Sequence, residues 1–260
     1  MRHWFSRIGT YLQTHYALQL EYRLELFFWV LTQIWPLFWM ALWAKGGEPR
    51  LGFPPEAFLR YYFFAWLATQ FNTTWSAYLL ATMILRGDLA PLLLRPFPVL
   101  LDLFTEHLGT LFAQLPLTLL VAAAVAAAVP EVLSAPLRAL PWFLFFAAMA
   151  FTFEFFLGVL VGSLSFWLEK STGLMELWHV LRVFLGGVAV PLLVLPKGVF
   201  ETLFWTPFPY FGYLPGALFA GMPAPVGKGA LLLSLWTLLV MLLALWVFRR
   251  GLRRFSAMGA

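Results

Sequence analysis

The sequence has no cysteine, and only 11% of its 260 residues are charged, against about 25% in an average soluble domain. The lack of cysteine excludes a disulfide framework, a thiolate metal site and a redox motif. The shortage of charge, together with 62% hydrophobic residues, predicts an integral membrane protein. We expect one all-α membrane domain over residues 1–260, because a helix satisfies its own backbone hydrogen bonds in lipid.

The sequence also lacks a catalytic or metal-binding constellation. It has neither a G-x-S-x-G nor an H-E-x-x-H motif, and none of its histidines has a second histidine three or four residues on. The stretch GMPAPVGKG, residues 221–229, resembles a P-loop, but its spacing is one residue too long and Gly229 replaces the hydroxyl residue that holds Mg²⁺. We expect no enzyme activity and no cofactor in this chain. The four isolated histidines are His3, His15, His107 and His179.

Long apolar runs account for most of the chain. A helix needs about 20 apolar residues to cross the bilayer core. On that measure the sequence predicts six membrane spans, with a kink at Pro36 in the first. The predicted spans are residues 24–44, 57–85, 108–129, 138–167, 177–195 and 230–248.

Two further segments are predicted to lie at the membrane surfaces. Residues 1–23 form an amphipathic pattern with Trp4, Ile8 and Tyr11 on one face, which favours an interfacial helix over a mobile lead-in. Residues 196–229 are apolar and interrupted by prolines, which favours short re-entrant helices at the outer face. The alternative for this second segment is a loop lying flat on the headgroups.

The basic residues predict the orientation. Net charge is +5, from 17 Lys and Arg against 12 Asp and Glu, and the basic residues flank apolar runs. This is the topology signal of a membrane protein and gives no support to nucleic-acid binding. With both termini in the cytoplasm, most basic residues fall on the inner side, including the cluster RRGLRR at residues 249–254.

Glu154 is a carboxylate within the predicted fourth span. Such a group costs about 2.5 kcal/mol or more to insert, so it is expected to face a protein interior or a water-filled cavity. It would line a pathway, or take part in structural pairing with a neighbouring helix. Gly158 and Gly162 form a G-x-x-x-G pair that is typical of close helix packing. The polar patch that supplies possible partners or pathway residues in the second span includes Gln70, Asn72, Thr73, Thr74 and Ser76.

The segment 86–107, between the second and third spans, combines apolar and charged residues with three prolines. Its pattern predicts a short helix, a break at Pro96–Pro98 and a second helix that leads into the third span. An apolar knob with charged edges suits docking to a soluble partner. The alternative is an interfacial helix-turn with no partner.

Three stretches together resemble the membrane-spanning subunits of ABC-2 type ABC transporters, in particular the bacterial six-span permeases. These are RGDLAPLLLRPFPVLLDLFTEHLG at 86–109, FWLEKSTGLMELWHVLRVFLGG at 166–187, and the basic tail FRRGLRRFSAMGA at 248–260. The order of a lead-in helix, six spans and a broken outer segment is also similar, as in the type V exporters. The resemblance covers essentially the whole chain.

This resemblance implies an exporter in the bacterial cytoplasmic (inner) membrane. Two permease subunits, identical or different, would form the pathway at their interface, and two copies of a separate ABC ATP-binding subunit would supply ATP and Mg²⁺ binding. A self-sufficient channel or proton-coupled carrier that uses Glu154 is the alternative. The resemblance assigns coupling to the ATP-binding subunit to Arg86, Gly87, Asp88, Leu94, Arg95 and Pro96.

Overall fold

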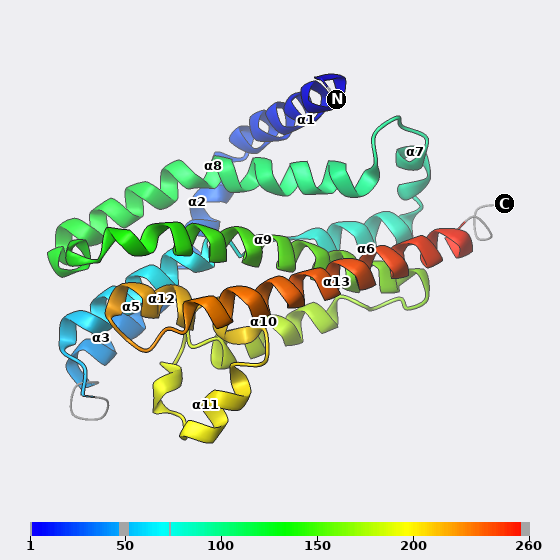
Figure 1. Ribbon diagram of the computed structural model, residues 1–260. Helices are drawn as coiled ribbons and strands as arrows, with labels where there is room; N and C mark the ends of the chain where they lie inside the picture. The colour runs from blue at the N-terminus through cyan, green and yellow to red at the C-terminus, as the bar shows by residue number, and fades with distance from the viewer. Residues whose placement is uncertain (1, 47–51, 73, 256–260) are drawn as a thin grey trace.

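The computed structural model describes residues 2–46, 52–72 and 74–255, and 81% of the chain is helical. The long helices lie side by side in an elongated bundle, with α7 and the end of α13 at one end (Figure 1). The expected all-α architecture is therefore confirmed.

The α-helices are α1 (Arg2–Glu21), α2 (Arg23–Thr32), α3 (Trp35–Gly46), α5 (Pro55–Thr69), α6 (Ser76–Arg86), α7 (Leu89–Leu93), α8 (Val99–Ala128), α9 (Leu140–Ser163), α10 (Gly173–Leu185), α11 (Lys197–Leu203), α12 (Tyr213–Ala220) and α13 (Val226–Phe255). Single 3₁₀ turns are η1 (Pro130–Ser134), η2 (Leu137–Ala139), η3 (Leu164–Phe166), η4 (Leu192–Val194) and η5 (Phe208–Tyr210).

Four helical stretches of the described chain are long and apolar enough to cross a membrane: Leu24–Gly46, Val99–Ala128, Leu137–Phe166 and Val226–Phe255. They correspond to the predicted first, third, fourth and sixth spans. The predicted fourth span, 138–167, nearly coincides with its counterpart, whereas the sixth is longer than the predicted 230–248. The number of six spans stays a prediction, because the second and fifth are built differently.

The predicted second span, 57–85, is two helices separated by an irregular turn. The 15 residues of α5 end at Thr69, and the 11 residues of α6 begin at Ser76. Polar side chains occupy this turn, and Gln70 and Asn72 are 3% and 1% exposed. Irregular backbone at membrane depth is tolerated only where protein or a cavity covers it. The polar patch therefore marks a break in a helix rather than a polar face of one.

The predicted fifth span, 177–195, is a half-length helix. The 13 residues of α10 end at Leu185, and Gly187 then takes a positive φ of 80°. A side chain at Gly187 would also meet the Tyr61 hydroxyl at 2.8 Å, so both the backbone and the space favour glycine here. The paired glycines stop this helix before it reaches spanning length.

Two predicted boundaries shift because of proline. The first span breaks between α2 and α3 at residues 33–34, just before Pro36, where a proline fits the first turn of the new helix. The third span begins at Val99, directly after the extended Pro98, and continues to Ala128. The second short helix expected within 86–107 is thus the first part of α8.

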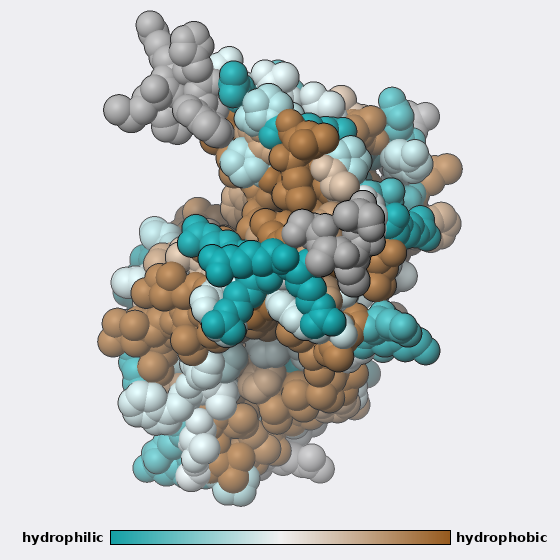
Figure 2. Space-filling view, turned by 90° about the vertical axis from the view of Figure 1, so that its right-hand side faces the viewer, coloured by the Kyte–Doolittle hydropathy of each residue, from teal (hydrophilic) through white to brown (hydrophobic). Residues whose placement is uncertain are grey.

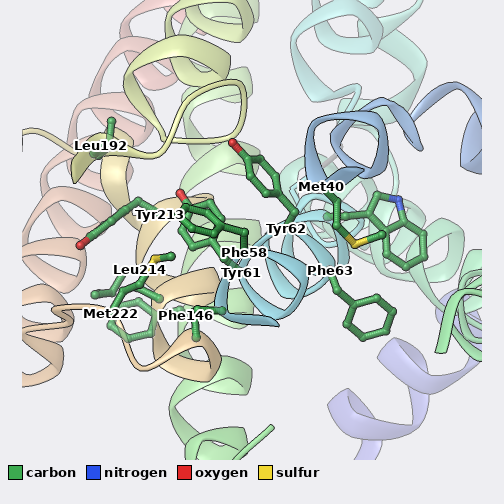
Figure 3. Packing of buried hydrophobic residues seen from close by; sticks show 14 of the residues in the cluster. Met40, Phe58, Tyr61, Tyr62, Phe63, Phe146, Leu192, Tyr213, Leu214 and Met222 are labelled. Atoms are coloured by element: carbon green, nitrogen blue, oxygen red, sulfur yellow. The ribbon is translucent and has the colours of Figure 1, made fainter. Parts of the chain in front are cut away.

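The segment 196–229 contains the short helices α11 and α12, while its re-entrant character stays a prediction. Among the largest buried residues of the protein are Tyr61 on α5 and Tyr213 on α12 (Figure 3). The Tyr61 hydroxyl donates to the Gly187 carbonyl at 2.6 Å. A Cβ at Gly216 would lie 2.6 Å from the Tyr61 carbonyl oxygen, so α12 packs directly on the α5 backbone. Their position relative to the membrane stays a prediction.

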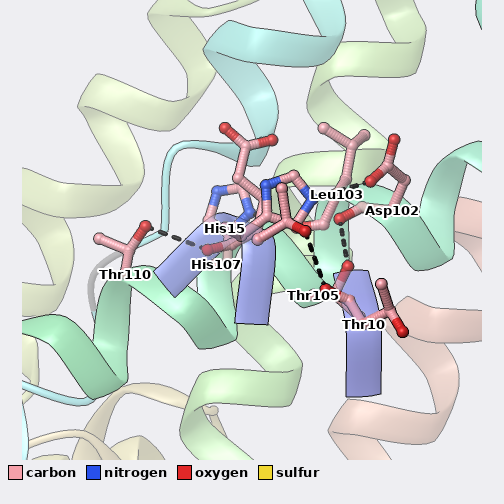
Figure 4. A network of polar contacts seen from close by, with 9 residues as sticks. Thr10, His15, Asp102, Leu103, Thr105, His107 and Thr110 are labelled. Atoms are coloured by element: carbon pink, nitrogen blue, oxygen red, sulfur yellow. Dashed lines mark hydrogen bonds and ion pairs between the residues drawn. The ribbon is translucent and has the colours of Figure 1, made fainter. Parts of the chain in front are cut away.

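The N-terminal helix α1 follows the first part of α8 (Figure 1). His15 Nε2 lies 2.8 Å from Asp102 Oδ1 (Figure 4), and the Tyr11 ring stacks on Phe97 at 4.0 Å between centroids. A Cβ at Gly109 would meet His15 Cβ at 3.0 Å, so the two helices approach closely. The predicted helix over 1–23 is thus present and docks on α8, while its place in the membrane interface stays a prediction.

Candidate functional site

The first candidate site is the corner between α6 and α8, which we call the docking corner (residues 86–98). Gly87 ends α6 in the left-handed conformation, with φ of 82°, and α7 follows it. Leu89 is fully buried, and Phe97 is 4% exposed beneath the Tyr11 ring. These two side chains anchor the corner on both sides of α7, so it is a fixed shape rather than a loose loop.

The docking corner presents an apolar tip. Leu94 is 87% exposed and Leu93 is 41% exposed. Charged side chains flank the tip, because Arg86, Asp88 and Arg95 are all exposed. Figure 2 looks onto this end of the molecule, where hydrophilic side chains gather beside hydrophobic surface. All six residues that the resemblance assigned to coupling are on the surface of this corner: Arg86, Gly87, Asp88, Leu94, Arg95 and Pro96.

The second candidate site is a buried polar cluster around Glu154. The side chain of Glu154 is fully buried, and its Oε1 accepts a hydrogen bond from Arg182 Nη1 at 2.6 Å. Trp178 Nε1 donates to the same oxygen at 2.9 Å. Both partners lie on α10, so the carboxylate of α9 holds the half-length helix in place. This geometry supports the structural interpretation of Glu154.

Arg182 also connects the cluster to the turn between α5 and α6. Its Nη1 donates to the carbonyl oxygen of Asn72 at 3.0 Å, and Asn72 Nδ2 donates to the Phe211 carbonyl at 3.1 Å. Of the predicted pathway residues, Asn72 and Glu154 therefore meet through Arg182. Gln70 is buried but makes no hydrogen bond to this cluster within the described residues. Thr73 lies outside the described residues.

Several buried polar atoms near this turn have no hydrogen-bond partner within the described parts of the chain. They include both amide atoms of Gln70, Asn72 Oδ1, Thr74 Oγ1 and Glu154 Oε2. Most buried polar groups in proteins are paired, and exceptions gather where function requires them. The turn therefore retains unused hydrogen-bonding capacity.

Two cavities, one beside the polar cluster and one beside the docking corner, share two lining residues. One, of about 200 Å³, is lined by Asn72, Thr74 and Arg182. The other, of about 670 Å³, is lined by Asp88 and Arg95. Trp29 and Trp75 line both cavities, and their rings lie 4.8 Å apart between centroids. The two tryptophans thus stand between the corner and the buried ion pair.

Sequence reasoning missed Arg182 and Trp178 as the partners of Glu154. Arg182 falls inside the predicted fifth span, 177–195. A charge of opposite sign in another apolar segment is the signal that identifies such a partner. Trp178 gave no comparable signal, because it is one of 13 tryptophans spread along the sequence.

The fold defines a multi-pass α-helical membrane protein, and no group of three or more His, Cys, Asp or Glu residues able to hold a metal occurs in its described parts. A family model described as ABC-2 family transporter protein matches residues 29–259, so the chain belongs to that family. It is the membrane component of a transporter and is not itself catalytic. The family generally pairs with ABC ATP-binding subunits. None of the curated proteins matches the chain.

Proposed function

We propose that the chain is the permease subunit of an ATP-driven exporter and binds its ATP-binding subunit through the docking corner. The exposed Leu94 at the tip, with buried Leu89 and Phe97 as anchors, carries this proposal. An exposed leucine on a fixed corner fits an apolar pocket of a partner, while Asp88 and Arg95 at its edges set the orientation. ATP and Mg²⁺ bind on the partner, in two copies per transporter.

The end that holds the docking corner is the cytoplasmic end in this proposal. Arg249, Arg250 and Arg254 are exposed at the end of α13, which lies at the same end as α7 (Figure 1). Lys and Arg favour the cytoplasmic side of a membrane protein. This orientation places both termini in the cytoplasm of a bacterial cell, with the protein in the inner membrane.

A second permease subunit completes the pathway. The cavities beside the docking corner and beside Arg182 share Trp29 and Trp75 as lining residues, which supports a pathway along these two side chains. Closure of the ATP-binding subunits would push the docking corner and, through it, α6 and α8. A partner that binds one conformation more tightly than the other supplies the free energy for this movement.

The proposal is tested by co-purification and ATPase measurements with the cognate ATP-binding subunit. We expect Leu94→Asp, and separately the double variant Asp88→Arg with Arg95→Glu, to reduce assembly and stimulated ATPase activity at least about tenfold, as expected when an interface anchor is lost.

The matched control is Leu137→Asp. Leu137 is 81% exposed, close to the 87% of Leu94, but it lies in η2 beyond the far end of α8. Leu137→Asp should assemble like the parent chain. If Leu94→Asp and the charge-reversal variant also assemble and stimulate ATPase activity like the parent, the docking corner does not couple the subunits.

The alternative of a self-sufficient channel or proton-coupled carrier uses Glu154 together with the polar patch of the second span. It receives less support, because Glu154 Oε1 already accepts hydrogen bonds from both Arg182 and Trp178. Transport by the chain in liposomes without an ATP-binding subunit, abolished by Glu154→Gln, would favour this alternative.

A further inference from the structure

A third cavity, of about 240 Å³, lies beside the Trp29–Trp75 pair and is lined by residues of α1, α2, α8 and the turn before α6. Glu25 and Glu106 contribute its carboxylates, while Trp29 and Trp75 contribute aromatic rings. These two tryptophans also line the cavities that lead to the docking corner and to Arg182. The third cavity, which we call the chamber, therefore shares its aromatic walls with the other two.

The charge of this chamber is negative. Two glutamates line it, and neither Lys nor Arg does so within the described part of the chain. Glu25 accepts only a long hydrogen bond, 3.3 Å from Trp29 Nε1. Glu106 is half-buried and Glu25 is exposed, and a cation that enters between them stabilises both carboxylates. The chamber is thus electrostatically suited to a cationic ligand.

Of the two histidines near the chamber, His107 does not neutralise it. His107 Nε2 accepts the Trp75 backbone N–H at 2.8 Å. Its Nδ1 lies 2.6 Å from the Leu103 carbonyl, to which it must donate. This pair of bonds fits only a neutral imidazole with its proton on Nδ1. His15 is also engaged, because it pairs with Asp102 (Figure 4).

Gln114 is an independent sign of a ligand. Its side chain is only 6% exposed and lines the chamber. No hydrogen-bond partner for it occurs within the described residues. Its amide atoms are not among the enclosed polar atoms, so they are open to the chamber and available to a ligand.

We propose that the chamber binds a small organic cation, with its positive charge between Glu25 and Glu106 and its apolar part on Trp29 and Trp75. Aromatic rings attract quaternary and primary ammonium groups through their negative faces. The inference rests on the proposed function in one respect, since it makes organic cations the class of molecule that the permease moves.

The test is equilibrium dialysis of the purified full chain in a non-ionic detergent, without an ATP-binding subunit. The probes are phenyltrimethylammonium, which stays cationic at every pH, and benzenesulfonate, an anion of similar shape. We expect the cation to bind and the anion not to bind. The double variant Glu25→Gln with Glu106→Gln should weaken cation binding by about tenfold or more, and Trp29→Leu by about tenfold.

The matched control is Glu131→Gln, which removes an exposed glutamate in η1, far from the chamber. It should bind the cation like the parent, which excludes an effect of net charge. The inference is wrong if benzenesulfonate binds as tightly as the cation, or if the double variant, eluting and unfolding like the parent, retains full cation binding. The ATPase assay shows whether the docking corner assembles with its partner. Cation binding is measured without that partner, so failure of assembly does not change the binding result.

Discussion

At the residue scale, the Glu154–Arg182 pair decides how α10 is held. The Glu154 side chain is fully buried and the Arg182 side chain is 16% exposed. Removing two charges from water is costly, and close attraction repays this cost only when both partners are present. Removing one partner of this 2.6 Å contact would therefore leave the other as an unpaired charge in the protein interior, which lowers stability.

Arg182→Met should lower the stability of the protein by about 3–5 kcal/mol, because it leaves the Glu154 carboxylate buried without its counter-charge. Adding Glu154→Gln to this variant should restore much of the loss, since a neutral amide still accepts a hydrogen bond from Trp178. Thermal unfolding in detergent is the measurement. We expect the parent to unfold at the highest temperature, the double variant at a lower temperature and the single variant at the lowest. Arg138→Met, which removes an exposed arginine, is the control and should unfold like the parent. Equal unfolding temperatures for all four proteins would contradict a structural role of the pair.

The pairing of single residues was only partly predictable from the sequence. The cost of a carboxylate in lipid identified Glu154 as a residue that needs a partner. The partner itself depends on how α9 and α10 pack, and Arg182 lies 28 residues further along the chain. Spacing within one helix carries no information on a contact of that kind.

At the element scale, glycines fix the distance between α6 and α9. A Cβ at Gly158 would lie 2.0 Å from Ser76 Oγ, and one at Gly162 would lie 2.9 Å from the Ala77 carbonyl oxygen. Ser76 Oγ in turn donates to the Phe155 carbonyl at 3.0 Å. The G-x-x-x-G prediction is thus confirmed as a close helix contact, which holds the second half of the broken span against α9.

Gly158→Ala should destabilise the protein by about 1–3 kcal/mol, because the added methyl group forces α6 away from α9. Combining it with Ser76→Ala should recover part of the loss by removing the nearest atom. Gly9→Ala in α1 is the control, since a Cβ there meets nothing within 4 Å and alanine favours helix by about 0.5–1 kcal/mol. Thermal unfolding of the four proteins gives the comparison. A Gly158→Ala variant as stable as Gly9→Ala would show that the helices are not in tight contact.

The type of each element was predictable, while the continuity of two spans was not. Apolar length alone located Leu24–Gly46, Val99–Ala128, Leu137–Phe166 and Val226–Phe255. The interrupted second span has an apolar composition on both sides of its turn. A hydropathy window therefore averages over the turn and does not show the break. Its turn is stable because Arg182 binds the Asn72 carbonyl, and that contact comes from a distant helix. The short fifth helix ends at adjacent glycines, a signal that was present in the sequence at Gly186 and Gly187.

At the scale of the whole molecule, the two ends of the bundle differ in chemistry. The end with α7 carries the docking corner and the arginines of α13 (Figure 1). The opposite end carries η1 and η2, where Leu133 and Leu137 are 71% and 81% exposed. Since α8 crosses from one end to the other, these two surfaces lie on opposite sides of any membrane that α8 spans.

The parent chain contains no cysteine, so single introduced thiols report this arrangement without background. We expect Leu137→Cys to react with a membrane-impermeant maleimide in intact cells, because the proposed orientation puts η2 outside. Leu94→Cys should react only after the cells are permeabilised, because the same proposal puts the docking corner in the cytoplasm. Both leucines are more than four-fifths exposed, so access rather than burial decides the outcome. Labelling of both thiols in intact cells would mean that α8 does not cross the membrane, and the reverse pattern would place the docking corner outside, where no ATP-binding subunit can reach it.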